Sequence, residues 1–290
     1  MKAKQFVERL MNALFFLCGV LAIASVALIA IYMIVSGIPA IHEIGLLNFL
    51  TGEVWASTAA EPKFGILPFI LTSVYGTAAA TLIGVPVGLF TAVFLAKIAP
   101  RRVADKIRPA IDLLAGIPSV VYGLVGVSVL VPLIAQVFGL PKGTSLLAAI
   151  LVLSVMILPS IVSVSETALA AVPPEYEEAS LALGATHIET IFRVSIPAAR
   201  SGIAAGVVLG IGRAIGEAMA VMMVAGNVAN MPSLFDSVTF LTTAISKEMS
   251  YASGLQRQAL FSIALVLFIF IMLINVVLGA LLKRGGRKEK

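Results

Sequence analysis

Two charged residues lie within an otherwise uncharged apolar stretch. Between residues 201 and 235, Arg213 and Glu217 are the only Asp, Glu, Lys or Arg residues. Charges at membrane depth cost about 2.5–3.5 kcal/mol each on insertion scales, so they are candidates for function. Residues four apart share a helix face and can form an ion pair. This pair could lock two helices together. Alternatively, Arg213 could line an anion path with its charge moderated by Glu217, because a guanidinium offers planar donors suited to oxyanions.

Small residues run beside these charges in the same stretch. Gly or Ala occurs at every fourth position, and this spacing lets another helix approach closely. The sequence therefore predicts a helix with a packing stripe next to the charged pair. The residues of the stripe are Gly202, Gly206, Gly210, Ala214 and Ala218.

The preceding segment, residues 169–200, has the features of a helix–Gly–helix module. A proline pair ends the helix before it, and Pro174 suits the first turn of a new helix. Three glutamates follow, at the positive end of the new helix dipole. Gly184 can end this helix because glycine adopts positive φ without penalty. We expect helices over 174–183 and 186–194. The glutamates are Glu175, Glu177 and Glu178.

The charge of this module bears on what it contacts. Helices that lie on anionic membranes usually carry Lys or Arg on the polar face. This module carries mostly Glu, which favours a protein partner over a position on the bilayer surface.

The composition places both features in a membrane protein. Of 290 residues, 60% are hydrophobic and 12% are charged, against about 45–50% and 25% in soluble domains. This balance excludes disorder, collagen, coiled coils and nucleic-acid binding. A bilayer core needs about 20 apolar residues per helix. The continuous apolar runs predict an all-α integral membrane protein with six transmembrane helices, near 12–36, 66–96, 112–138, 144–167, 200–226 and 257–282.

The basic residues predict the orientation of these spans. With six spans, 15 Lys and Arg residues fall on the side of the two termini and 4 on the other side, while Arg213 lies within a span. Loops rich in Lys and Arg remain in the cytoplasm. Both termini and the 169–200 segment are therefore expected to be cytoplasmic.

No segment outside the spans is long enough for a separate domain. We divide the chain into an N-terminal span with an outward-facing loop (1–65), a core of five spans (66–282) and a basic cytoplasmic tail (283–290). The outward segment 227–256 contains apolar residues at helical spacing. It is either a short interfacial or re-entrant helix, or a surface loop.

Several catalytic signatures are absent from the sequence. There is no G-x₄-G-K-[ST] phosphate loop, no H-E-x-x-H and no G-x-S-x-G. His42 and His187 are far apart and lack metal-ligand neighbours. The chain is therefore expected to be neither an ATPase nor another enzyme, and to bind no metal.

A string in the 169–200 segment resembles a transporter signature. It reads Glu178-Ala179-Ser180, three residues, Gly184, nine residues, Val194-Ser195-Ile196-Pro197. This resembles the EAA loop of bacterial ABC importer permeases, E-A-A-x₃-G-x₉-I-x-L-P. The departures at Ser180, Val194 and Ile196 are conservative. The resemblance implies a type I ABC importer permease in which helix 174–183 docks in a cleft of a separate ATPase subunit. The implied coupling residues are Glu178, Ala179, Ser180, Gly184, Val194, Ile196 and Pro197.

Two further strings narrow this resemblance. Residues 114–123 read LAGIPSVVYG, and residues 212–227 read GRAIGEAMAVMMVAGN. Both resemble the permease pair of the high-affinity phosphate importers, PstC and PstA, and the run from Met219 to Asn227 is more similar to PstC. The resemblance covers roughly residues 66–282. It implies that Arg213 and Glu217 belong to a phosphate pathway.

The resemblance also implies an assembly in the bacterial inner membrane. It would contain a second, PstA-like permease and two copies of a PstB-like ATPase, and it would receive inorganic phosphate from an external PstS-like binding protein. The ATPase would use ATP and Mg, and this chain would bind no cofactor. The alternatives are a permease for another oxyanion, such as molybdate or sulfate, and a secondary transporter or channel.

Overall fold

The computed structural model describes residues 2–286, and most of them are helical. Three π-helical turns, η1 (Phe94–Ile98), η2 (Gly126–Leu130) and η3 (Ile191–Ser195), continue α3, α5 and α9. β1 (Trp55–Ala56) and β2 (Lys63–Phe64) form a short antiparallel hairpin. The helices are α1 (Lys2–Ile44), α2 (Leu46–Thr51), α3 (Leu67–Val93), α4 (Arg101–Gly116), α5 (Ser119–Val125), α6 (Val131–Phe138), α7 (Leu146–Ala170), α8 (Pro174–Ala182), α9 (His187–Thr190), α10 (Ile196–Ala198), α11 (Arg200–Gly216), α12 (Met219–Val224), α13 (Leu241–Glu248) and α14 (Gly254–Gly286).

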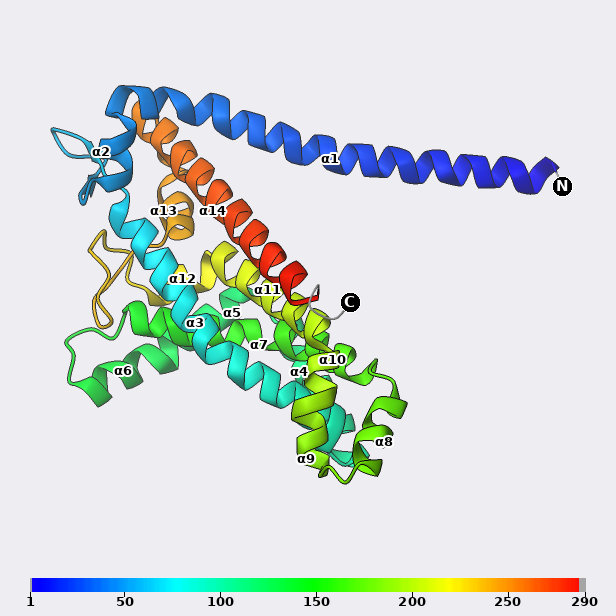
Figure 1. The fold of residues 1–290 in the computed structure, drawn as a ribbon. Helices are drawn as coiled ribbons and strands as arrows, with labels where there is room; N and C mark the ends of the chain where they lie inside the picture. Colours follow the sequence, from blue (N-terminus) through cyan, green and yellow to red (C-terminus); the bar gives the residue numbers. More distant parts are fainter. Residues whose placement is uncertain (1, 287–290) are drawn as a thin grey trace.

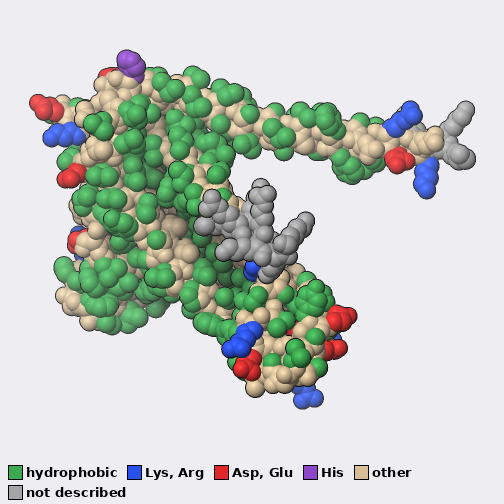
Figure 2. Space-filling view, viewed as in Figure 1, with side chains coloured by type: hydrophobic (Ala, Val, Ile, Leu, Met, Phe, Trp, Pro, Cys, Tyr) green, Lys and Arg blue, Asp and Glu red, His purple; other side chains and the backbone are tan. Residues whose placement is uncertain are grey.

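The apolar helices confirm an all-α membrane protein. Within residues 2–286, five helical segments are long and apolar enough to cross a bilayer, and a sixth candidate joins His187–Ala198 to Arg200–Gly216 across a 71° bend. In Figure 2, hydrophobic side chains cover the middle of the molecule, whereas charged ones gather at the end that holds α8 and α9, at the opposite end and at the tip of α1. The five segments are Val7–Ile44, Leu67–Ile98, Ser119–Phe138, Leu146–Ala170 and Gly254–Val277.

The first helix is longer than the predicted span of 12–36. It continues to Ile44 with Pro39 inside it. Its last turns pack on α14, where the Ser262 hydroxyl donates to the Gly37 carbonyl over 2.7 Å. The rest of α1 leaves the bundle and extends away from it (Figure 1). Packing against α14 thus sustains the helix beyond the predicted end.

The third predicted span, 112–138, is divided into separate helices. Residues Arg101–Gly116 form α4, and the next helix begins at Ser119. Ile117 between them is extended, with ψ of 127°, as is typical of the residue before a proline. The Ile117–Pro118 step therefore ends α4 and lets the spanning helix start later than predicted.

Helix α7 forms the centre of the bundle and packs against α3 and α11. Its side chains Leu153, Ile157 and Ile161 are fully buried. A side chain at Gly210 of α11 would lie 2.9 Å from Ile161 Cγ1, so only glycine permits this close approach. The predicted packing stripe is confirmed from Gly202 to Ala214.

Candidate functional site

Arg213 and Glu217 lie where the fifth span breaks. Helix α11 ends at Gly216, and Glu217 is extended with φ of −72° and ψ of 128°. The Glu217 carboxylate accepts the Ala220 N–H over 3.0 Å at the start of α12. Within residues 2–286 no ion pair joins Arg213 to Glu217. The predicted pair within one continuous helix is therefore wrong, because Glu217 lies outside α11 and stabilises the next helix instead.

The Arg213 guanidinium has no ion-pair partner among the residues that the structure describes. The residue is half-buried, and it forms no hydrogen bond or ion pair with any residue that the structure describes. Its charge acts on Tyr122 of α5, whose hydroxyl donates to the Leu114 carbonyl over 2.7 Å. The fold therefore brings together the 114–123 and 212–227 strings. A cation in this position can meet an anion without first losing a protein carboxylate.

The break is held in place by α13. The Thr242 hydroxyl donates to the Glu217 carbonyl over 2.7 Å, and the Ser73 hydroxyl accepts the Leu241 N–H over 3.0 Å. Leu241 and Ala244 are buried. The segment 227–256 therefore contains a packed short helix over Leu241–Glu248, and the surface-loop alternative is wrong for these residues.

An apolar cavity of about 610 Å³ lies among α3, α5 and α7. Tyr122 and Ser154 contribute to its lining, but Arg213 does not. An anion in this cavity would meet no charged side chain, so the cavity is a poor candidate for an anion site. Among residues 2–286, no group of three His, Cys, Asp or Glu side chains could hold a metal ion.

The 169–200 segment forms the predicted helix–Gly–helix module. Gly184 follows α8 with φ of +88°. Its N–H donates to the Leu181 carbonyl over 2.9 Å, and the Ala185 N–H donates to the Ser180 carbonyl over 3.3 Å. These two bonds form a Schellman motif, which satisfies carbonyls at the helix end and requires a left-handed residue at this position. The predicted role of Gly184 as a helix terminator is confirmed.

The second helix of the module begins with a capping box. The Thr186 hydroxyl accepts the Glu189 N–H, and the Glu189 carboxylate accepts the Thr186 N–H over 2.9 Å. These bonds lower the pKa of the Glu189 carboxyl. The Thr-x-x-Glu spacing is readable from the sequence. It fixes the start of α9 independently of tertiary packing.

The other predicted coupling residues divide between the surface and the interior of the module. Glu178, Ala179 and Pro197 are exposed, whereas Val194 and Ile196 are half-buried. Ser180 shares a hydrogen bond with Thr190 over 2.9 Å, which joins α8 to α9. Ser180 thus supplies a polar contact between the two helices.

The module presents apolar side chains to solvent. Leu183 is 90% exposed, Tyr176 is 56% exposed and Ile188 is 54% exposed. No residue of α8 is buried. Exposed apolar side chains beside glutamates form a surface suited to a protein partner.

From the sequence, Glu177 is only one of the three glutamates at the start of α8, and no partner is predicted for it. It forms an ion pair with Lys97 of η1 over 2.5 Å and accepts a hydrogen bond from Ser195 of η3 over 2.7 Å. Burial alone raises the pKa of Glu177, but Lys97 and Ser195 outweigh this effect and leave the pKa below its ordinary value. In the sequence, Lys97 is only one of the 15 basic residues whose distribution predicts the orientation of the spans. Its partner, Glu177, lies 80 residues away in the sequence.

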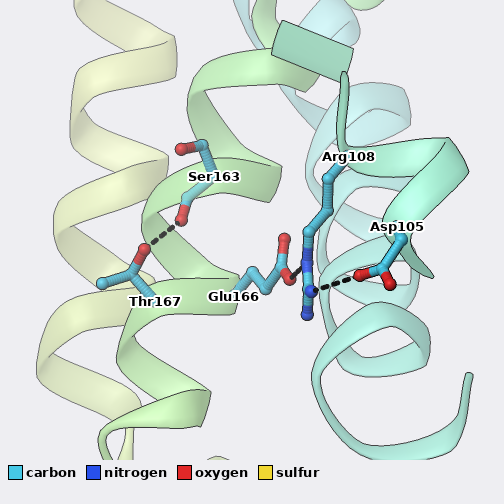
Figure 3. Close-up of polar contacts among 5 residues, drawn as sticks. All are labelled: Asp105, Arg108, Ser163, Glu166 and Thr167. Carbon is cyan, nitrogen blue, oxygen red and sulfur yellow. Dashed lines mark hydrogen bonds and ion pairs between the residues drawn. The ribbon is translucent and has the colours of Figure 1, made fainter. Parts of the chain in front are cut away.

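A second ion pair joins α4 to α7 at the same end of the bundle. Figure 3 shows Arg108 between Glu166 of α7 and Asp105 of its own helix. The Arg108–Asp105 pair is looser, with 3.8 Å between Nη1 and Oδ1. These contacts fix α4 against the end of α7 beside the 169–200 segment.

The two candidate sites are separate. Arg213 lies near the C-terminal end of α11, and the helix–Gly–helix module precedes the N-terminal end of that helix. Thirteen residues at 1.5 Å each place Arg213 about 20 Å from Arg200 along the axis. Helix α11 therefore connects the module to the break in the fifth span.

Comparison with known proteins gives consistent results. The family model described as "Binding-protein-dependent transport system inner membrane component" matches residues 84–288. A probable ABC transporter permease protein, YqgH, from Bacillus subtilis is 44% identical and covers 89% of this chain and 86% of its own length. The phosphate transport system permease protein PstC from Mesorhizobium japonicum is 36% identical, over 82% of this chain and 78% of the relative. PstC from Haemophilus influenzae is 32% identical, over 93% and 91%.

Solved structures share the fold at low sequence identity. The MetNI methionine ABC transporter in an inward-facing conformation matches with a TM-score of 0.61 and 19% identity, over 76% of this chain and 95% of that one. A bacterial alginate ABC transporter, in complex with its alginate-bound periplasmic protein, matches with a TM-score of 0.58 and 15% identity, over 94% of each chain. These matches concern the fold alone.

Proposed function

We propose that this chain, which belongs to the family of binding-protein-dependent transport system inner membrane components, is the transmembrane permease subunit of an ATP-driven phosphate importer. Inorganic phosphate passes from an external binding protein to the cytoplasm by alternating access. The type I ABC permease fold and the similarity to PstC proteins over most of the chain support this function.

The main evidence for an anionic substrate is the Arg213 guanidinium, which has no ion-pair partner among residues 2–286. An arginine that forms no ion pair within the described part of the chain, at the break of an apolar span, is an electrostatic site for an anion. A guanidinium matches the oxygens of phosphate in geometry and donors. Glu217 shapes the break through its contact with α12.

The partners follow from the same proposal. A PstA-like permease completes the pathway, and two copies of a PstB-like ATPase bind ATP and Mg and dock on the α8–α9 module of each permease. A PstS-like protein delivers phosphate from outside. Both termini of this chain face the cytoplasm, as the distribution of Lys and Arg predicts.

The test is transport by the reconstituted four-component complex. Proteoliposomes that contain ATP are supplied with the phosphate-loaded binding protein, and uptake of radiolabelled phosphate is measured. We expect uptake that requires ATP and the binding protein and that excess molybdate or sulfate does not abolish. Uptake without ATP would favour a secondary transporter. Transport of molybdate or sulfate in place of phosphate would assign another oxyanion.

A further inference from the structure

Glu177 lies at the meeting point of three segments. One oxygen of its carboxylate, Oε1, contacts Lys97 Nζ over 2.5 Å and the Ser195 hydroxyl over 2.7 Å. Lys97 belongs to η1 at the end of α3, and Ser195 belongs to η3, which leads through α10 into α11. A single side chain of α8 therefore connects this helix to the ends of two helices of the bundle core.

The contact is well protected from solvent. The side chains of Lys97 and Glu177 are 11% and 20% exposed, and Ser195 is fully buried. Ion pairs on open surfaces contribute little because water and salt screen them, but this screening is weak for buried pairs. The lowered pKa of Glu177 keeps the carboxylate charged at neutral pH.

Little else holds α8 against the spans. None of its residues is buried, and its hydrogen bond between Ser180 and Thr190 stays within the helix–Gly–helix module. In the described part of the chain, Lys97–Glu177 is the one ion pair that joins α8 to α3. Helix α3 in turn packs closely on α7, where a side chain at Gly84 would lie 2.6 Å from Ile157 Cδ1.

Both neighbours of Glu177 come from π-helical turns. Such turns are irregular points within helices and occur often at functional sites. Helices α3 and α9 thus change their winding in the turns that supply Lys97 and Ser195.

We propose that the Lys97–Glu177 ion pair is the positioning link that transmits movement of α8 to α3, so that a docked ATPase moves α3 and α11 together. This inference rests on the proposed function, because it assigns the mechanical connection between the ATPase and the phosphate pathway. Glu177 and Lys97 are positioning residues, and neither contacts phosphate. If the pair merely supported folding, its loss would reduce the amount of assembled complex but not the phosphate moved per ATP.

The experiment measures the coupling ratio in the reconstituted four-component complex. The variants are Glu177→Gln, Lys97→Glu, Glu177→Lys and the double exchange Lys97→Glu with Glu177→Lys. Asp112→Asn is the matched control, because it removes an exposed carboxylate of α4 that lies outside the helix–Gly–helix module. For each complex, ATP hydrolysis and phosphate uptake are measured and divided by the amount of assembled transporter.

We expect the single variants to assemble and hydrolyse ATP while phosphate moved per ATP falls by about tenfold, the smallest effect expected from losing one hydrogen bond to a charged group. The double exchange should recover most of the phosphate moved per ATP, and Asp112→Asn should match the wild type. An unchanged ratio in Glu177→Gln, or no recovery in an assembled double exchange, would overturn the link. If a charge reversal prevents assembly, Glu177→Gln, which has nearly the same shape, decides the outcome. Failure of the wild-type complex to transport phosphate would instead refute the proposed function.

Discussion

The Thr242 hydroxyl donates a hydrogen bond to the main-chain carbonyl of Glu217, with 2.7 Å between the oxygens. This bond fastens α13 to the residue at which the fifth span leaves its helix. The Glu217 carbonyl belongs to an extended residue and takes no part in the regular bonding of α11. The position of Arg213, four residues earlier, is thus fixed both by α11 and by a helix that follows it by more than twenty residues in the sequence.

Removing the Thr242 hydroxyl should loosen this break. Thr242→Val keeps the shape but leaves the Glu217 carbonyl without its donor, which costs about 1–3 kcal/mol for a buried polar group. We expect a lower melting temperature of the purified complex and reduced phosphate uptake. Thr242→Ser retains the hydroxyl and should be close to the wild type. Equal melting temperatures for the Val and Ser variants would show that the bond does not stabilise the break.

Arg213→Gln should abolish most phosphate uptake while the complex assembles normally. Because Glu217 forms no ion pair with Arg213, this change leaves no carboxylate stranded. The loss of a hydrogen bond to a charged group, about 1.5–3 kcal/mol, corresponds to roughly tenfold to a hundredfold weaker interaction with phosphate. Uptake kinetics and the yield of purified complex are the two measurements.

The double variant Arg213→Gln with Glu217→Gln tests whether the effect of Arg213 depends on the charge of Glu217, although no ion pair joins the two residues. On our proposal, it remains inactive, because the guanidinium is still missing. Arg213→Lys should retain part of the activity, since it keeps the charge but not the planar donors. Restored uptake in the double variant would refute contact between Arg213 and phosphate.

Gly184→Val should uncouple transport from ATP hydrolysis or release the ATPase. Gly184 has φ of +88°, and no atom lies within 4 Å of the position that a Cβ would occupy. The penalty is therefore purely one of backbone conformation, about 1–3 kcal/mol for a residue held in a disfavoured region. Gly184→Asn is the control, because Asn tolerates positive φ better than β-branched residues. Pull-down of the ATPase and phosphate uptake should both be lower for Gly184→Val than for Gly184→Asn. Normal uptake by Gly184→Val would contradict the role of Gly184 in coupling.

The orientation of the chain can be tested by cysteine labelling. In a Cys18→Ser background, a cysteine at Lys142 or Lys247 should react with an impermeant thiol reagent added outside intact cells. A cysteine at Arg102 or His187 should react only after the cells are opened. All four positions are exposed in the structure, so burial does not explain a difference. The reverse pattern would mean that the distribution of basic residues misassigns the cytoplasmic side.

The contribution of Glu177 to stability should depend on pH. Its pKa lies below the ordinary value of 4.5 in the folded chain, so folding favours the charged carboxylate. The stabilisation is complete above the ordinary value and disappears as the pH falls through the lowered pKa. We expect the melting temperature of the wild-type complex to exceed that of Glu177→Gln at pH 7, and this difference to shrink as the pH falls below the ordinary value of 4.5. If the difference in melting temperature does not change with pH, a cause other than ionisation of Glu177 is responsible for it.

The sequence alone determined the features that depend on neighbouring residues. The lengths of the apolar runs predicted six spans, because a helix satisfies its own backbone bonds across the bilayer. Within residues 2–286, five of these are helices long and apolar enough to cross a bilayer, and the sixth candidate is a pair of helices bent by 71°. Pro174 and Gly184 specified where α8 begins and ends, because a fixed φ and a permitted positive φ act within one turn. The EAA-like string and its spacing likewise identified the module as a candidate for docking an ATPase.

Only the tertiary structure decided the features that join distant segments. The spacing of Arg213 and Glu217 predicted a pair, but α12 and Thr242 of α13 hold Glu217 outside the helix. The Lys97–Glu177 pair joins residues far apart in the chain, and no local pattern marks either as a partner of the other. Local rules set each residue's own backbone preference, whereas these contacts arise from the packing of whole helices on α7 and from burial that weakens solvent screening. Such packing depends on residues throughout the chain, so the periodicity of one segment does not reveal it.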